Sequence, residues 1–248
     1  MNAVITQHAD LALGAVVGSN IANLILVMAA TTIIFPITNI NNNQINQAWI
    51  NIALGIALIF MSYFYFNFVF GIISLILLTF IMYIQIKRGS LNIDEISKGD
   101  YSTIISISLI IIGIVFLIYG SELFVSSAIN LANTFSVSET VIGLSLIAFG
   151  TSLPELVVGV MSALKRKVDF ALGNILGSNI YNVLGVLGVI SFFDHFTMPN
   201  VLATQDLIFM LFLTFMILGF MYISKKLGKT YGVIGLVLYF SYMYFIYI

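Results

Sequence analysis

Residues 10–23 read DLALGAVVGSNIAN, and residues 169–182 read DFALGNILGSNIYN. The two stretches are offset by 159 positions and are identical at nine of their fourteen positions, including all of GSNI and the final Asn. Residues 150–156 read GTSLPEL and stand ahead of the second copy. The same offset would place the counterpart of Glu155 five positions before Met1. We therefore expect a duplicated unit whose first copy is represented only in part.

The composition is typical of a protein within a lipid bilayer. Hydrophobic residues make up 60% of the sequence, charged residues make up 8%, and the mean hydropathy is +1.11, whereas soluble domains carry about 25% charged residues. Residues 48–86 and 101–121 contain no charge at all. Segments in lipid must satisfy their backbone groups internally, and the sequence lacks the alternation of a β-barrel, so the spans are helices. The predicted class is an all-α polytopic membrane protein.

Other functional classes are disfavoured by the same composition. The chain contains no Cys, so a disulfide framework or a thiolate metal site is excluded. Its formal net charge of −1 argues against binding to nucleic acid. Neither His8 nor His195 is accompanied by a nucleophile and base, so we interpret both as loop residues and predict no enzymatic activity.

Polar breaks divide the chain into about eight apolar segments. Their approximate bounds are 11–36, 48–66, 68–86, 103–132, 138–163, 170–192, 204–224 and 231–248. The Asn-rich stretch 39–47 is predicted to be a solvated loop.

The nine Lys and Arg residues test this division and orient the chain. They fall into three loops: Lys87, Arg88 and Lys98; Lys165, Arg166 and Lys167; Lys225, Lys226 and Lys229. Two predicted spans separate consecutive basic loops, so all nine cations lie on one side, which is predicted to be the cytoplasmic side. Both chain ends then lie outside, and the two GSNI helices run in opposite directions. This arrangement indicates inverted repeats around a substrate site near the bilayer midplane.

Glu155 is the strongest candidate for that site. An ionisable side chain in mid-span costs about 2.5–3.5 kcal/mol, and Pro154 must kink the helix near the carbonyl of Gly150. Thr151 and Ser152 add hydroxyl oxygens on the same stretch. A carboxylate, hydroxyls and freed carbonyls form a set of hard oxygen ligands suited to Ca²⁺ or Na⁺. The alternative is an acid that is hydrogen-bonded within the bundle for structure alone.

The GSNI helices supply neutral oxygen ligands to the same site. Ser19 and Asn23 share one helix face, as do Ser178 and Asn182. Hydroxyl and amide oxygens can coordinate a hard cation without adding charge. The alternative is that these Asn residues only join neighbouring helices through hydrogen bonds.

The remaining polar and small residues of these segments are given structural interpretations. For Asn20 and Asn179 we favour interhelical hydrogen bonding over ion binding. Asp10 and Asp169 precede their helices and are predicted N-caps, and Glu122 is expected to support the helix packing. The glycines form GxxxG spacings that allow helices to approach closely: Gly14 with Gly18, and Gly173 with Gly177.

These motifs resemble the calcium/cation antiporter superfamily, the sodium/calcium exchanger type of membrane protein. Residues 143–188 resemble the whole of the second family repeat, and residues 10–27 resemble the latter part of the first. The resemblance implies a ten-helix fold of two inverted halves, of which about eight helices are represented here. It also implies exchange of Ca²⁺ for Na⁺, or for another monovalent cation, by alternating access, with these ions transported and no cofactor.

The resemblance also implies a division of the chain and a set of ligands. Residues 1–86 would be the remnant of the first half, residues 87–100 a cytoplasmic linker, and residues 101–248 the second half. The implied cation-binding residues are Ser19, Asn23, Ala148 through its carbonyl, Thr151, Ser152, Glu155, Ser178 and Asn182. Glu155, Asn23 and Asn182 would be the principal metal ligands, although several family members carry an acid at the position of Asn182.

The charge of the site leads to two hypotheses. Two opposed carboxylates can balance a divalent ion, whereas Glu155 alone leaves about one positive charge uncompensated in a low-dielectric site. We therefore expect an antiporter that is impaired in this N-terminally shortened form; the alternative is a non-transporting remnant or an assembly subunit. The expected partners are the lipid bilayer, Ca²⁺ and monovalent cations. The expected location is a prokaryotic plasma (inner) membrane, and homo-oligomerisation is left open.

Overall fold

The computed structural model describes residues 9–38, 40–87, 103–135, 139–192 and 205–246. Its helices are α2 (Ala9–Ala22), η1 (Asn23–Val27), α3 (Met28–Ile34), α4 (Asn42–Met61), α5 (Phe68–Lys87), α6 (Thr103–Phe135), α7 (Glu139–Ile142), η3 (Gly143–Ile147), α8 (Ala148–Thr151), α9 (Leu153–Leu164), α10 (Val168–Tyr181), η4 (Asn182–Val186), α11 (Leu187–Ile190), α12 (Leu207–Ile223) and α13 (Lys229–Ile246). All eight apolar segments coincide with helices, and no β-strand occurs in the described ranges. The predicted all-α fold is confirmed.

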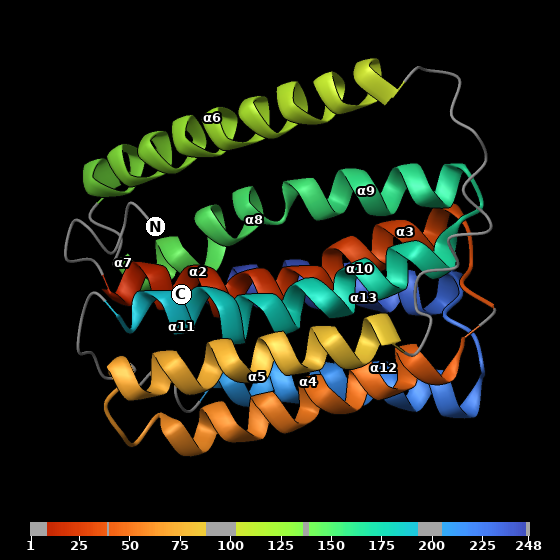
Figure 1. Cartoon of the computed structure of the whole chain (residues 1–248), viewed down its shortest axis with the longest axis horizontal. Coiled ribbons are helices and arrows are strands. Elements are labelled where there is room, and N and C mark those ends of the chain that lie inside the picture. Colours follow the sequence, from red (N-terminus) through yellow and green to blue (C-terminus); the bar gives the residue numbers. More distant parts are fainter. Residues whose placement is uncertain (1–8, 39, 88–102, 136–138, 193–204, 247–248) are drawn as a thin grey trace.

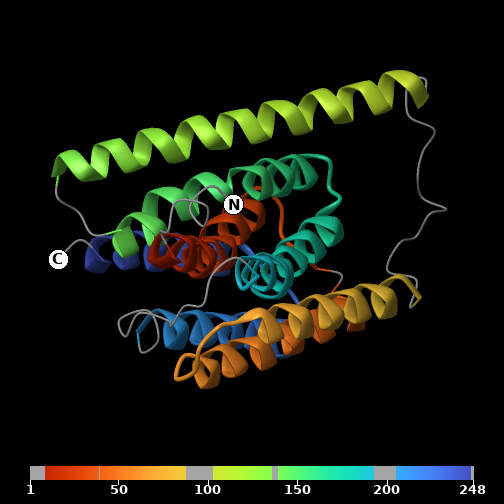
Figure 2. The same ribbon diagram turned by 60° about the vertical axis from the view of Figure 1, so that its left-hand side comes forward.

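The helices lie side by side along the long axis of the molecule (Figure 1). The continuous helix α2–η1–α3 packs on α7–α9 and on α13, while α10–η4–α11 packs on α4, α5 and α9. Helix α6 is the outermost element and contacts α7, η3 and α8 (Figure 2). The two repeat copies therefore form the centre of the bundle.

Four helices of the described chain are long and apolar enough to cross a membrane, or five if one bent pair is counted as a single span. These helices differ greatly in burial. In the most apolar window of Ala12–Ile34, 89% of the residues are buried inside the protein, against 17% for Phe68–Lys87. Helix α5 exposes Ile73, Ile76 and Phe80, as expected of a peripheral helix that faces lipid. The GSNI helix α2 is instead a core helix.

The fifth span is the bent pair, and its bend lies at the GTSLPE motif. Gly143–Thr151 and Leu153–Leu164 meet at 48°, with Ser152 between them and Pro154 in the first turn of α9. Proline suits that position because its missing N–H would have no helical partner there. The predicted kink is confirmed, and the bend leaves Ser152 completely buried.

Each GSNI motif runs directly into a π-helical turn. Turn η1 begins at Asn23, and turn η4 begins at Asn182, 159 positions later. The duplication is thus reproduced in an irregular backbone feature as well as in the sequence. Such π turns leave backbone groups without their usual partners and are frequent at functional sites; inside η1, the Leu24 carbonyl accepts the hydroxyl of Tyr231.

The prediction of a solvated loop at 39–47 is wrong for most of that stretch. Helix α4 begins at Asn42, and Asn41 caps it by exchanging hydrogen bonds with Gln44. The Nε2 of Gln44 also donates to the carbonyl of Asp169 at 3.0 Å. An N-x-x-Q capping box was the sequence signal for this helix start, and the polar composition concealed it.

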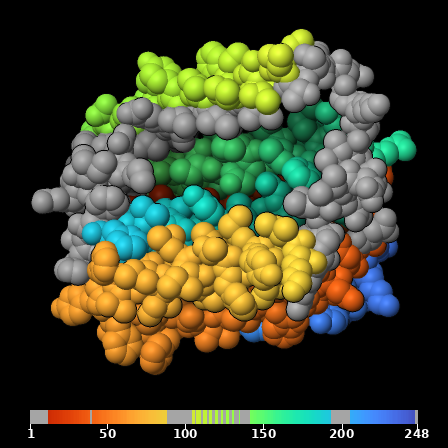
Figure 3. All heavy atoms as spheres, in the orientation of Figure 1, coloured from red at the N-terminus to blue at the C-terminus, as the bar shows by residue number. Residues whose placement is uncertain are grey.

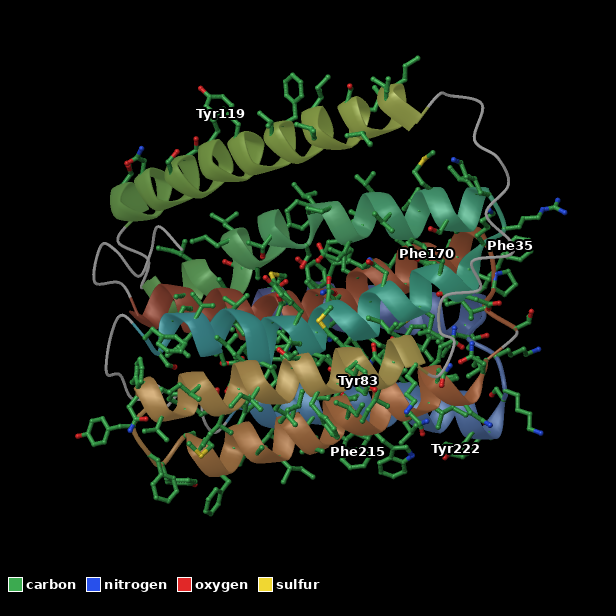
Figure 4. All side chains as sticks on the ribbon, viewed as in Figure 1. Phe35, Tyr83, Tyr119, Phe170, Phe215 and Tyr222 are labelled. Atoms are coloured by element: carbon green, nitrogen blue, oxygen red, sulfur yellow. The ribbon has the colours of Figure 1, made fainter. Side chains whose placement is uncertain are left out.

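The described basic loops lie at one end of the bundle. The guanidinium of Arg166 is 5.8 Å from the ring centre of Phe35, and Ile37 forms an antiparallel bridge with Leu227, next to the basic residues of the α12–α13 loop. Phe35 and Phe170 lie at this same end in Figure 4. Orientation relative to the cytoplasm stays a prediction.

Candidate cation site

Asn20 and Asn179 connect the two repeat copies at the centre of the molecule. The Nδ2 of Asn20 donates to the backbone carbonyl of Asn179 at 3.4 Å, and the Nδ2 of Asn179 donates to the carbonyl of Asn20 at 3.2 Å. The two residues are equivalent in the duplication, 159 positions apart. Their reciprocal contact therefore lies on the pseudo-two-fold axis that relates α2 to α10.

Two further residues extend this symmetry on both sides of the axis. The Nδ2 of Asn23 donates to Oδ1 of Asn179 at 2.9 Å and to Oγ of Ser178 at 3.1 Å. Equivalently, the Nδ2 of Asn182 donates to Oδ1 of Asn20 at 3.0 Å and to Oγ of Ser19 at 3.4 Å. Each repeat thus binds the amide group of the other.

The α8–α9 bend adds a hydroxyl on the α2 side of the axis. The Oγ atoms of Ser152 and Ser19 are 2.9 Å apart, and Ser152 also donates to the Ser19 carbonyl at 3.4 Å. Further along both helices, a Cβ on Gly159 would lie 2.5 Å from Oγ1 of Thr31. Helix α9 therefore runs parallel to α2–η1–α3. Glu155 lies on α9 between these two contacts, and α9 packs on η1, the turn that begins at Asn23.

We call these eight residues the central polar cluster: Ser19, Asn20, Asn23, Ser152, Glu155, Ser178, Asn179 and Asn182. Oε2 of Glu155 and Oδ1 of Asn23 are buried in the described structure without a hydrogen-bond donor. Buried polar atoms of native proteins almost always have a partner. A carboxylate oxygen and an amide oxygen both lack a proton to give, so a hard cation would satisfy them.

Five of the seven predicted neutral ligands belong to the central polar cluster. The other two, Thr151 and Ala148, form hydrogen bonds within their own helix instead. The hydroxyl of Thr151 donates to the carbonyls of Ile147 at 3.0 Å and Ala148 at 3.1 Å within its own helix. The Ala148 carbonyl also accepts the amide of Ser152 at 3.1 Å. Thr151 and Ala148 are thus occupied by local helix bonds, and their ligand role stays a prediction.

Of the glycines in the two GxxxG spacings, Gly18 is found in close contact with a neighbouring helix, and Gly173 and Gly177 are not. A Cβ on Gly18 would lie 2.5 Å from the carbonyl oxygen of Leu144 and 2.7 Å from the Cβ of Ala148. At Gly173 and Gly177, no described atom of a neighbouring element lies within 4 Å of a Cβ. The prediction of close packing is therefore not met at Gly173 and Gly177 among the described residues, because α7–α8 covers α2 and no described helix covers the same face of α10.

The predicted N-cap at Asp169 is also wrong. Helix α10 begins at Val168, its N-cap residue is Lys167, and Asp169 lies inside the first turn. An acid in that turn still interacts favourably with the helix dipole. The side chains of Asp10 and Glu122, together with His8 and His195, lie outside the part of the structure that is described.

The described residues hold no group of three or more His, Asp or Glu side chains placed to bind a metal. The central polar cluster thus combines one carboxylate, Glu155, with neutral oxygens. Amide and hydroxyl ligands around a single acid are the chemistry of a weakly charged site for hard cations. Such a site favours reversible binding over tight metal retention.

Comparison with known proteins agrees with this chemistry. The family model described as "Sodium/calcium exchanger protein" matches residues 1–87 and 105–248. The chain is 36% identical over 242 residues to an uncharacterised membrane protein of Methanocaldococcus jannaschii, covering 94% of this chain and 76% of that protein. It is 44% identical over 81 residues to a sodium/calcium exchanger of Methanosarcina acetivorans, covering 33% of this chain and 23% of that protein.

Solved structures show the same relationship. A structure of the sodium-calcium exchanger NCX_Mj, soaked with 2.5 mM Na⁺ and 10 mM Sr²⁺, matches with a TM-score of 0.76 and 32% identity. The match covers 96% of this chain and 78% of that one. The matching family model and two of these relatives are described as sodium/calcium exchangers, which are transporters, so the prediction that the chain is not an enzyme is supported. The chain belongs to the sodium/calcium exchanger protein family.

Proposed function

We propose that the chain is a calcium:cation antiporter that exchanges Ca²⁺ for Na⁺ by alternating access. The observation that carries the proposal is the pair of buried acceptors, Oε2 of Glu155 and Oδ1 of Asn23, which have no donor in the described structure. Family membership is consistent with this chemistry, because the named relatives include sodium/calcium exchangers.

The chemistry of the site accounts for exchange. Glu155 supplies the charge that attracts a cation out of water, while hydroxyl and amide oxygens replace part of its hydration shell. Ca²⁺ and Na⁺ are both hard cations that would use the same oxygens, so occupancy by one excludes the other. The pseudo-two-fold arrangement of α2 and α10 supports alternating access, because inverted repeats allow one site to open toward either side.

We propose that the 248 residues alone bind Ca²⁺ weakly. The described centre contributes one carboxylate, so a bound divalent ion would keep about one unit of uncompensated charge in a medium of low dielectric constant. Na⁺, with a single charge, would be balanced by Glu155. The 248-residue chain should therefore favour Na⁺ more strongly than a form that supplies a second acid.

We also propose a cellular location for the protein from the distribution of its basic residues. The described basic residues cluster at the end of the bundle that carries Arg166 and Leu227, and the excess of Lys and Arg in one set of loops indicates the cytoplasmic side. We place the protein in a prokaryotic plasma membrane with the linker 87–100 in the cytoplasm. Homo-oligomerisation stays open.

The test is ⁴⁵Ca²⁺ uptake into proteoliposomes driven by a Na⁺ gradient. Two forms are compared, the 248-residue chain and a version in which a second copy of residues 103–164 precedes residue 9, which adds a second GTSLPE motif and with it a counterpart of Glu155. We expect weak uptake by the first form and uptake at least about tenfold faster by the second, because the added carboxylate balances the charge of Ca²⁺. A tenfold change corresponds to about 1.4 kcal/mol of free energy. Absence of Na⁺-driven uptake in both forms would favour the non-transporting subunit. Strong uptake by the 248-residue chain would support antiport and overturn the charge argument.

A further inference from the structure

We infer that Asn20 and Asn179 are positioning residues that orient the carboxamides of Asn23 and Asn182, so that oxygen rather than NH₂ faces the cation. The inference rests on the proposed function for the identity of the ligand. It is carried by the hydrogen bonds of the central polar cluster, in which each repeat orients a ligand that belongs to the other repeat.

The orientation of Asn23 follows from the inventory of its donors. A carboxamide has two N–H donors, and both are used, by Oδ1 of Asn179 at 2.9 Å and by Oγ of Ser178 at 3.1 Å. The proton of Ser178 goes to the Ile175 carbonyl at 3.1 Å, so its oxygen acts as an acceptor. A flipped Asn23 would place oxygen against two acceptors and lose both hydrogen bonds. Oδ1 is therefore left as the buried free atom.

Asn179 can direct Asn23 because its own carboxamide is held in turn. Its Nδ2 donates to the backbone carbonyl of Asn20 at 3.2 Å, which leaves Oδ1 to face Asn23. Asn179 and Asn20 are each only 2% exposed, so water offers neither amide an alternative partner. The backbone carbonyl of Asn20 thus determines, through Asn179 of the other repeat, which side-chain atom of Asn23 meets the cation.

An equivalent series of hydrogen bonds orients Asn182 of the second repeat through Asn20 of the first. The Nδ2 of Asn20 donates to the Asn179 carbonyl, and Oδ1 of Asn20 accepts Nδ2 of Asn182 at 3.0 Å. The second proton of Asn182 reaches Oγ of Ser19 at 3.4 Å. The two equivalent series of hydrogen bonds meet at the pseudo-two-fold axis, where Asn20 contacts Asn179. Interhelical bonding and control of the ligands are therefore two consequences of one arrangement.

The direct test observes the carboxamides by NMR, with ¹⁵N-labelled Asn in the full 248-residue chain in detergent. Asn179→Leu removes the acceptor of Asn23 at nearly constant volume. The Asn23 NH₂ resonances are expected to shift and to exchange with solvent about fivefold faster, as expected for the loss of a hydrogen bond with a net contribution of about 1 kcal/mol. Asn174→Leu is the matched control on the same helix, and Asn20→Leu should act equivalently on Asn182. Unchanged Asn23 resonances in folded Asn179→Leu protein would overturn the inference.

A second measurement separates positioning from packing. Ion-dependent thermal stabilisation is titrated with Na⁺ and with Ca²⁺ for Asn179→Leu, Asn23→Ala and the double variant. Asn179→Leu should raise the half-maximal concentration about tenfold alone and less than about twofold in the Asn23→Ala background, because coupled residues are not additive. Equal effects in both backgrounds would mean independent packing and refute the inference. If Asn23→Ala leaves ion binding unchanged, the proposed function loses this ligand, and the NMR result still decides whether the amides are coupled.

Discussion

Helices α2 and α10 carry nearly the same motif in very different surroundings. In the most apolar stretch of the span Ala12–Ile34, which contains most of α2, 89% of the residues are buried inside the protein. The corresponding share for the span Val168–Ile190, which contains α10, is 56%. The face of α2 at Gly18 is filled by Leu144 and Ala148, whereas the equivalent face at Gly177 meets no described neighbour. In Figure 3 the surface is hollowed between α6 and α11, with the atoms of α8–α10 on its floor.

The motif therefore determines the polar contacts, and the surroundings determine the packing. The amide bonds are matched on both sides of the axis, from Asn23 to Asn179 and from Asn182 to Asn20. The bent helix α8–α9, which supplies Ser152 and Glu155, packs on α2–η1–α3 and on α10, and the described part of the first repeat has no helix equivalent to it. The site is therefore symmetric in its neutral ligands and asymmetric in its charge.

The largest expected effect comes from removing that single charge. Glu155→Gln keeps the shape of the side chain and abolishes its charge, so ion-dependent thermal stabilisation and any Na⁺-driven ⁴⁵Ca²⁺ uptake should fall to background. Insertion into the membrane should be unaffected, since a neutral amide is cheaper to bury than a carboxylate. Asp169→Asn, an exposed acid on α10, is the control and should keep ion binding. Undiminished ion binding in Glu155→Gln would remove Glu155 from the site.

The next effect compares the two glycines directly. Gly18→Ala places a methyl group 2.5 Å from the Leu144 carbonyl oxygen, and overpacking of this kind costs about 1–3 kcal/mol. Gly177→Ala meets open space and should be neutral or stabilising by about 0.5–1 kcal/mol, because Ala is the better helix former. Thermal unfolding in detergent measures both. Equal destabilisation at the two positions would show that the face of α10 is covered in the folded protein.

Asn23 and Asn182 offer a smaller and more selective comparison. An acid at Asn182, which is half-buried, supplies the second carboxylate and should tighten Ca²⁺ binding about tenfold, a fraction of the roughly 4 kcal/mol Coulomb term at 4 Å. Asn23→Asp gives up two donors in a fully buried position. It should lower stability by about 1–3 kcal/mol.

Calcium titration by calorimetry, together with thermal unfolding, distinguishes the two Asp variants. Asn182→Asp also gives up two donors, to Oδ1 of Asn20 and Oγ of Ser19, but water can replace part of this loss at its half-buried position. It should therefore raise calcium affinity with a smaller loss of stability than Asn23→Asp. Identical behaviour of the two variants would contradict the asymmetry of charge and burial between the repeats.

The sequence predicts the costly features of this site and misses the cooperative ones. Glu155 and Pro154 stand out because a charge in mid-membrane and a proline within a helix each need a specific compensation. The contact between Asn20 and Asn179 depends on two helices that are 159 residues apart, so neither motif alone could show that they bond across an axis. The π turns at Asn23 and Asn182 have no local signal either.

The smallest expected effect concerns two neighbouring hydroxyls at the bend between α8 and α9. Ser152 faces α2 and bonds to Ser19, whereas Thr151 is exposed and bonds to carbonyls of its own helix. Ser152→Ala should cost about 0.5–1.5 kcal/mol of stability, and Thr151→Ala should stay within about 0.5 kcal/mol of the parent. Thermal unfolding without and with Na⁺ checks both values. If Thr151 binds the cation, its variant will weaken the stabilisation by Na⁺ while leaving ion-free stability unchanged. If it does not, Thr151→Ala will match the parent in both conditions, and the enclosed side of the site will hold Ser152 as its only hydroxyl from the bend.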